Sequence, residues 1–236
     1  MAKLLREILK PSGEEHGISP DQFKSDLKGK EPVDYHHLHD VAQQHLTGDT
    51  SHIDSGMLKS ISRYTQNSNP GYKEINGFLR NNANSPHAKV HAENLKKAIE
   101  GHSLPNSTWG YRGIHDVHAE NLRKLKRGDV FHNDGITSTT LDPNRATHFA
   151  RGQDILAVHM PKGQKALYLS HPHLNSWSTE REMALPPKTS FKYNGSEPIE
   201  AHEHDYTGHR TGIKKKFTLH HVEIIPHSNK SIAIDR

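Results

Sequence analysis

The spacing of apolar residues changes near residue 105, and this change constrains the fold more than any other feature of the sequence. The clearest helical pattern comes before it, at residues 85–101, where Ser85 suits an N-cap, Pro86 the first helical position and Gly101 the helix end. After residue 105, short apolar runs are separated by Gly, Pro, Asn and Ser, a pattern typical of strands. The sequence therefore predicts an α+β fold with a helical front and a β-rich core.

Weaker helical and strand patterns fill in this outline. Helical patterns occupy residues 2–10, 20–28, 34–46 and 56–64. Strand patterns occupy residues 109–114, 134–140, 154–160, 165–170, 180–186 and 215–226. One helix interrupts the strands, because Asp142 is a good N-cap and Pro143 fits the first helical position. We interpret the hydrophilic stretch 192–212 as a long exposed loop.

Composition excludes several classes of protein. The 236 residues include no cysteine, so the chain has neither disulfides nor a thiolate nucleophile. It has no apolar run near the roughly 20 residues that cross a bilayer and no secretory signal at its start, so we expect a soluble, cytoplasmic protein without a membrane partner. A net charge of +4 favours a polyanionic partner only weakly. The sequence says nothing about the oligomeric state.

Histidine is unusually frequent, with 22 copies. A local cluster contains His36, His37, His39 and His45. A metal site needs at least three converging ligands with supporting hydrogen bonds, and most exposed histidines are only solvated. We therefore expect no metal.

Two acids one residue apart, Glu180 and Glu182, stand out in the segment 178–187 (STEREMALPP). In an extended backbone they would face one side, while Arg181 would face the other. Read alone, the segment is a polar entrance to a strand that Pro186 and the following proline end.

Two further signals precede this pair in the chain. Arg112 lies in a predicted strand, where it is either an ion-pair partner or a clamp on phosphate or carboxylate. Gly113 follows it and would let another group approach the backbone. Ser138 and Thr140 would share one face of a strand just before the helix at Asp142, a pattern that is also typical of ordinary capping.

In this order, the motifs resemble the arginine-serine-glutamate class of mono-ADP-ribosyltransferases, in particular the clostridial binary-toxin and bacteriophage enzymes. The matching segments are 111–113 (YRG), 138–140 (STT), 147–150 (THFA) and 180–187 (EREMALPP), with a helical segment at 62–80. Thr140 departs from the serine that is common in the family, but it keeps the hydroxyl. The resemblance implies a phage or bacterial effector of toxin-like type.

The resemblance also implies a fold and a domain organisation. It spans about residues 60–225 and implies the ADP-ribosyltransferase fold, with two packed mixed or antiparallel sheets. We expect a catalytic domain at 61–236, with its helical part at 61–104 and its β-rich core at 105–236. Residues 1–60 would be a helical extension, to which the sequence assigns no role.

The activity implied is transfer of ADP-ribose from NAD to protein arginine, with release of nicotinamide. The transition state is oxocarbenium-like, and Glu182 would stabilise it. Glu180 would bind the acceptor guanidinium, Ser138 would orient Glu182, Arg112 would hold the phosphate and ribose side of NAD, and Gly113 would lie against the nicotinamide amide. The same resemblance implies that five further residues bind NAD, namely Tyr72, Asn76, Thr140, Phe149 and Arg151. It also implies that Trp177 contacts the acceptor, although Trp177 could equally be a packing residue.

Three other functions remain open at this stage. In an NAD glycohydrolase, water would intercept the same cation and Glu180 would be incidental. An RNA acceptor is permitted by the basic segment 122–128. A non-catalytic module could use the lysines and histidines to bind polyanions or metal. The identity of the acceptor is beyond the sequence.

Overall fold

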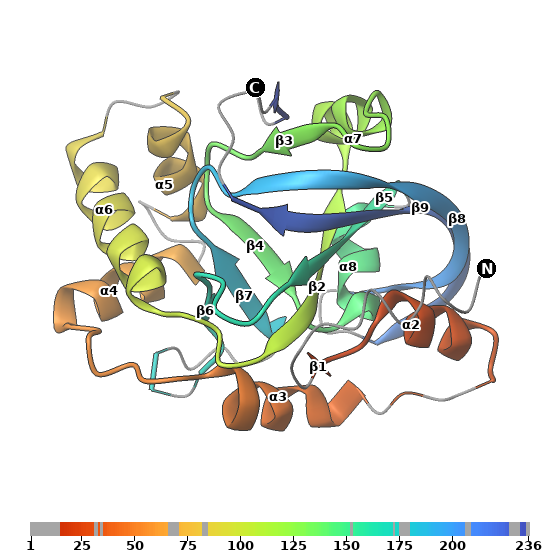
Figure 1. Cartoon of the computed structure of the whole chain (residues 1–236), viewed down its shortest axis with the longest axis horizontal. Helices are drawn as coiled ribbons and strands as arrows, with labels where there is room; N and C mark the ends of the chain where they lie inside the picture. The colour runs from red at the N-terminus through yellow and green to blue at the C-terminus, as the bar shows by residue number, and fades with distance from the viewer. Residues whose placement is uncertain are drawn as a thin grey trace.

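The computed structural model describes residues 15–30, 33, 35–65, 71–81, 85–151, 153–171, 173–174, 180–205, 209–226 and 232–234. Figure 1 shows helices packed around a large, curved sheet, so the expected α+β class is confirmed. The helix predicted at 2–10 and the side chain of Trp177 lie outside the described residues. Among the described residues, no helix has the length and apolar character needed to cross a membrane.

The strands form one hydrogen-bonded path, in the order β10-β3-β8-β9-β5-β2-β4-β7-β6, with β1 beside β2. Their bounds are β1 Glu15–His16, β2 Ser107–Ile114, β3 Val130–His132, β4 Thr137–Thr140, β5 Asp154–Met160, β6 Leu167–Tyr168, β7 Glu182–Leu185, β8 Ser190–His204, β9 Arg210–Ile225 and β10 Ile232–Ala233. Three pairs are parallel, β1 with β2, β10 with β3 and β5 with β9; the others are antiparallel.

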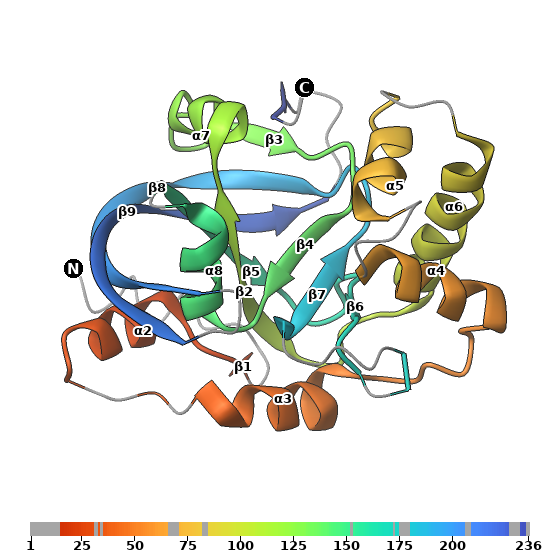
Figure 2. The same ribbon diagram turned by 180° about the vertical axis from the view of Figure 1, so that it is seen from behind.

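The two sheets implied by the resemblance are thus joined within the described residues, because β2 pairs on both sides. It pairs with β5 from Thr108 to Ile114, but its link to β4 is the single register pair of Tyr111 with Thr140. Beyond that link, β4 and β7 run at an angle to the long pair β8 and β9 (Figures 1 and 2). Residues of both strands near this link line the cavity described below.

A layer of three helices covers the end of the path at β6 and β7. These helices are α4 Ser55–Thr65, α5 Tyr72–Leu79 and α6 Pro86–Gly101. Ile61, Ile75 and Leu95 come from one helix each and join Leu167 and Ala184 of the strands in one buried cluster. The predicted cap is confirmed, since the Ser85 hydroxyl accepts from the Ala88 N–H. This layer fixes α4 and α5 beside β4.

The segment before α4 packs on the sheet at the other end of the molecule. It holds α2 Pro20–Leu27, the 3₁₀ turn Tyr35–His37, α3 Leu38–Val41 and the π turn Ala42–Leu46. Phe23 and Leu38 are buried against sheet residues that include Tyr111. A capping box at Ser19 begins α2 and confirms the helix predicted at 20–28. The consecutive helical turns from Tyr35 to Leu46 confirm the one predicted at 34–46. The domain boundary at residue 60 stays a prediction.

The interpretation of residues 192–212 as an exposed loop is wrong. Most of this stretch belongs to β8 and β9, which form a long antiparallel hairpin. Buried Tyr193, Ile199 and Ala201 give β8 a sparse apolar face against the core, while its other face is polar. Hydropathy averaged over the stretch hides this alternation, because the few buried residues are outnumbered by polar ones.

A buried charge network ties the helix α7 (Asp116–Arg123) to the sheet. Asp154 at the start of β5 is fully buried and pairs with Arg123, the last residue of α7. The Nε2 of buried His220 in β9 lies 2.7 Å from Asp154 Oδ1, and the Tyr193 hydroxyl lies 3.0 Å from the other ring nitrogen. Burial raises the pKa of Asp154, but the hydrogen bonds and charges of His220 and Arg123 outweigh this effect and hold the pKa below its usual range.

Candidate functional site

A cavity of about 410 Å³ opens between the helices α4 and α5 and the strands β2, β4 and β7. Its lining residues are Tyr64, Thr65, Tyr72, Asn76, Tyr111, Arg112, Gly113, His115, Ser138, Thr139, Thr140, Phe149, Glu180 and Glu182. Segments more than 100 residues apart in the sequence therefore meet here. Among the described residues, the cavity brings together every site residue predicted from the sequence except Arg151.

Glu182 is the first residue of β7 and is only 8% exposed. Its backbone N–H donates to the Ser170 hydroxyl at 2.9 Å, which fixes the start of the strand. Burial, together with the nearby charge of Glu180, raises the pKa of Glu182 to about 7, although a hydrogen bond from Ser138 and the charge of Arg112 oppose the shift. This carboxyl group can therefore change its charge near neutral pH.

Tyr64 in α4 is a functional candidate that the sequence analysis missed. Its hydroxyl lies 2.8 Å from Ser138 Oγ and accepts a hydrogen bond from Asn76 Nδ2 at 3.2 Å. Burial and the charge of Glu182 raise its pKa to about 12, so the hydroxyl stays protonated. A buried tyrosine hydroxyl needs a partner, and Tyr64 follows Ile61 on the apolar stripe of α4. That signal was available in the sequence.

Asn76 in α5 is buried and holds two elements together. Besides its bond to Tyr64, its Oδ1 accepts the backbone N–H of Ile136 at 2.8 Å, just before β4. Gly135 beside it has no room for a side chain, since an added Cβ would lie 2.7 Å from Asn76 Oδ1. Asn76 thus fixes the position of Tyr64 and of the strand that carries Ser138.

Arg112 and Gly113 lie side by side near the end of β2. The Arg112 guanidinium donates to the backbone carbonyl of Ser138 at 2.8 Å, which anchors it at the cavity wall. At Gly113, an added Cβ would lie 2.2 Å from the Ala150 nitrogen and 2.4 Å from the Phe149 carbonyl carbon. Another group does approach this glycine, and it is the backbone of α8 (Pro143–Ala150).

Glu180 and Arg181 depart from the extended geometry that the sequence suggested. Arg181 has φ of 48°, so the strand begins only at Glu182, and the expected alternation of faces is wrong. Both carboxylates nevertheless line the same cavity. The Arg181 side chain donates to buried Asp142 at 2.8 Å, a role that the sequence analysis did not assign.

Glu180 lies at the rim of the cavity and is exposed as a residue, although the protein crowds its carboxylate. This desolvation raises its pKa, while the charges of Arg145 and His148 lower it. Thr140 fixes the backbone of Glu180. The Thr140 hydroxyl donates to the backbone carbonyl of Glu180 at 2.8 Å and accepts from the backbone N–H of Asp142 at 3.1 Å. The threonine methyl does not prevent this arrangement.

Two aromatic side chains stand at the mouth of the cavity. Tyr72 and Phe149 are each 43% exposed and reach it from α5 and α8. Arg151 ends α8 with φ of 50° and is not among the lining residues. The role predicted for Trp177 falls outside the described residues.

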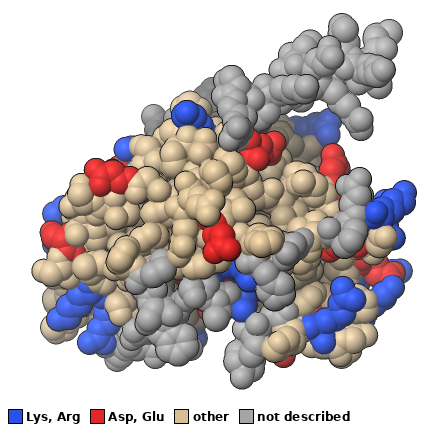
Figure 3. Space-filling view, turned by 90° about the horizontal axis from the view of Figure 1, so that it is seen from below, with Lys and Arg blue, Asp and Glu red and all other residues tan. Residues whose placement is uncertain are grey.

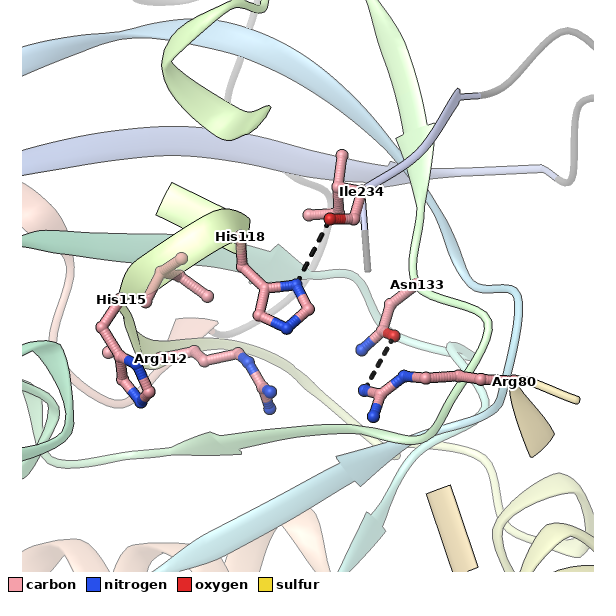
Figure 4. Close-up of a pocket in the computed structure, with 8 residues that line it drawn as sticks. Arg80, Arg112, His115, His118, Asn133 and Ile234 are labelled. Atoms are coloured by element: carbon pink, nitrogen blue, oxygen red, sulfur yellow. Dashed lines mark hydrogen bonds between the residues drawn. The ribbon is translucent and has the colours of Figure 1, made fainter. Parts of the chain in front are cut away.

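A second cavity of about 70 Å³ adjoins the first and shares Arg112, Gly113 and His115 with it. Figure 4 shows its other polar residues, Arg80, His118 and Asn133, around one space. Arg80 Nη2 lies 3.4 Å from Asn133 Oδ1. Arg80 was not predicted as a site residue, although Arg80 follows Asn76 by one helical turn and so lies on the same side of α5, at its C-terminal end.

Two observations bear on the alternative of a metal- or polyanion-binding module. In the described residues, no group of three His, Asp or Glu side chains could hold a metal ion. Positive and negative side chains are interspersed over the described part of the face in Figure 3. The net positive charge is therefore not gathered into one patch there.

Comparisons with known proteins identify a family and a shared fold. A family model described as ADP-ribosyltransferase exoenzyme matches residues 44–217, while no curated protein sequence matches the chain. Plx2a, an ADP-ribosyltransferase toxin from Paenibacillus larvae, is similar with a TM-score of 0.65 and 19% identity over 82% of this chain and 98% of that chain. C3stau2 from S. aureus, solved with NAD, is similar with a TM-score of 0.56 and 18% identity, over 82% of this chain and 96% of that chain.

A third solved structure is similar over part of its length. The enzymatic component C2-I of the C2 toxin from Clostridium botulinum has a TM-score of 0.57 and 15% identity, over 89% of this chain and 48% of that one. At these identities the three structures establish a shared fold. The fold that the sequence motifs implied is thereby confirmed.

Proposed function

The chain belongs to the ADP-ribosyltransferase exoenzyme family, and from this premise we propose that it transfers ADP-ribose from NAD to arginine side chains of a target protein, releasing nicotinamide. One observation carries the proposal: Glu182 is buried in a cavity that also holds Glu180, Ser138 and Arg112. The first acid suits the cleavage of NAD, and the second suits the capture of a cationic acceptor.

Cleavage breaks the bond between the ribose C1′ and the nicotinamide nitrogen, with the electron pair leaving on nicotinamide. Positive charge then develops on the ribose, and a carboxylate already fixed beside it stabilises that charge without reorganisation. Glu182 takes this role, and Ser138, itself held by Tyr64, keeps its carboxylate oriented. The cationic nicotinamide ring favours the ionised form of Glu182, which lowers its pKa when NAD binds.

The phosphates of NAD would lie toward Arg112, since a fixed guanidinium is the best protein partner for a phosphate oxygen. Arg80 opens on the adjoining cavity and extends this positive region. Tyr72 and Phe149 would cover the nicotinamide end at the mouth of the larger cavity. Asn76 would contribute mainly by holding the residues that touch NAD.

Glu180 would bind the acceptor. A guanidinium stays charged at neutral pH, so it can pair with the Glu180 carboxylate and present one nitrogen to C1′. As the new carbon–nitrogen bond forms, that nitrogen loses a proton, which Glu180 accepts and passes to water. Its position at the rim, on the same cavity as Glu182, allows a side chain from another protein to reach it.

The test is incubation of the protein with NAD labelled in its adenine portion and with a protein extract. We expect nicotinamide release together with label on protein, and we expect free agmatine, an arginine analogue, to compete for that label. Release of nicotinamide with no labelled protein would instead indicate an NAD glycohydrolase, a reaction that the exposed position of Glu180 permits because water reaches the same rim. Label that survives protease but is lost with ribonuclease would move the acceptor to RNA.

A further inference from the structure

His115 stands where the two cavities meet. It follows the last residue of β2 and precedes α7, and it lines both the larger and the smaller cavity. In Figure 4 the Arg112 side chain lies between those of His115 and Arg80. A ligand that extends from the larger cavity into the smaller one would therefore pass between these basic side chains.

Asp116 holds the imidazole of His115. The Nδ1 of His115 lies 2.6 Å from Asp116 Oδ2, so Nδ1–H donates to the carboxylate and Nε2 remains for a ligand. Asp116 has φ of 56°, a left-handed conformation that is unfavourable for residues other than glycine and is unusual in the first residue of a helix. The chain thus keeps a strained residue where its carboxylate can fix a side chain of the site.

We propose that His115, oriented by Asp116, binds the diphosphate of NAD beside Arg112. This assignment rests on the proposed function. In its protonated form the imidazole can donate from Nε2 to a phosphate oxygen while Nδ1 stays on Asp116, which gives a charge-assisted hydrogen bond. His115 is then a substrate-binding residue, and Asp116 is a positioning residue that acts through it.

Other charges around the two cavities set the sign of the pH dependence. Those that share a cavity with His115, or contact it, are Arg80 at the C-cap of α5, Arg112 of β2, Asp116 and His118 of α7, Glu182 of β7 and Glu180 just before it. Glu182 favours the nicotinamide cation more as pH rises, whereas a histidine on the diphosphate binds less well as pH rises. ADP-ribose has the diphosphate but no nicotinamide, so its affinity reports the contact of His115 with the diphosphate without the attraction between Glu182 and the nicotinamide cation.

The experiment measures binding of ADP-ribose and of nicotinamide by titration calorimetry at pH 6 and pH 8. The variants are His115→Gln and Asp116→Gly, with His87→Gln on the exposed face of α6 as the matched control. At pH 6 we expect His115→Gln to bind ADP-ribose about tenfold more weakly than wild type, the usual effect of losing one hydrogen bond to a charged group. The difference in ADP-ribose affinity between His115→Gln and wild type should be smaller at pH 8, and the two proteins should bind nicotinamide equally well.

Asp116→Gly keeps His115 but removes the carboxylate that orients it, and glycine adopts the left-handed conformation freely. It should fold at least as well as wild type and lose part of the ADP-ribose affinity. Unchanged ADP-ribose affinity in both variants overturns the assignment, as does an equal loss of nicotinamide binding in His115→Gln. Wild type that binds ADP-ribose but releases no nicotinamide from NAD would contradict the proposed function alone, while wild type that binds neither ligand would overturn both.

Discussion

Replacing Glu182 by glutamine should remove activity and at the same time stabilise the fold. The pKa of Glu182 is raised from 4.5 to about 7 by burial, so keeping this carboxylate ionised in the folded protein costs free energy. Converted at 1.36 kcal/mol per unit, the shift amounts to about 3 kcal/mol once the group is fully ionised. Glutamine keeps the shape and cannot ionise, so the variant escapes this cost.

The sign follows from proton binding. Between pH 4.5 and about 7 the folded protein holds the proton that the unfolded chain has released, so the free energy of unfolding of wild type falls as pH rises through this window. Glu182→Gln lacks this slope. Its advantage over wild type should therefore be below about 1 kcal/mol at pH 5 and about 3 kcal/mol at pH 8.

Urea denaturation at the two pH values measures the difference, and at pH 8 it corresponds to a melting temperature higher by about 8 °C for a chain of this size. The matched control is Glu93→Gln, which removes the same charge from the exposed face of α6. A difference between Glu182→Gln and wild type that is the same at both pH values would refute the reasoning. The kcat/KM for nicotinamide release by wild type should rise with pH through about 7, because this ratio reports the free enzyme and the ionised carboxylate is the active form.

Three further substitutions test the supports of the site. Tyr64→Phe removes the hydroxyl beside Ser138. It should lower the free energy of unfolding by about 1 kcal/mol, measured by urea denaturation, and slow nicotinamide release roughly tenfold in the NAD assay. Full activity would contradict the orienting role of Tyr64. Gly113→Ala places a methyl group on the Ala150 backbone and should cost about 3 kcal/mol or more in urea denaturation, and a stable variant would mean that α8 can move away from β2. Asp154→Asn should cost about 3 kcal/mol by breaking a buried ion pair, with thermal unfolding as the measurement and wild-type stability as the contradicting result.

Local sequence signals predicted most of the helices and most of the strands. Ser85 and Asp142 cap the helices as expected, because capping depends only on neighbouring residues. The strand β8 was missed, since its few buried residues are spread among polar ones and become recognisable only once β9 is paired beside it. Local pattern cannot show pairing between distant segments.

The site was predictable where ordered motifs carried it and not where packing did. Arg112, Ser138 and Glu182 could be named from their order in the chain, and the cavity brings them together. The sequence places Tyr64 on the apolar stripe of a helix, but its contact with Ser138 comes from tertiary packing, as does the position of His115 between the two cavities. The extended geometry expected for residues 180–182 was wrong because Arg181 turns back to pair with a buried acid, a partner that lies about 40 residues away in the chain.

The central claim is that two carboxylates on one cavity divide the reaction between them. The direct test compares wild type, Glu180→Gln and Glu182→Gln for nicotinamide release from NAD and for transfer of label to an arginine acceptor. We predict that Glu182→Gln loses both reactions, and that Glu180→Gln loses transfer while it still releases nicotinamide. Transfer retained by Glu180→Gln, or NAD cleavage retained by Glu182→Gln, would contradict the account.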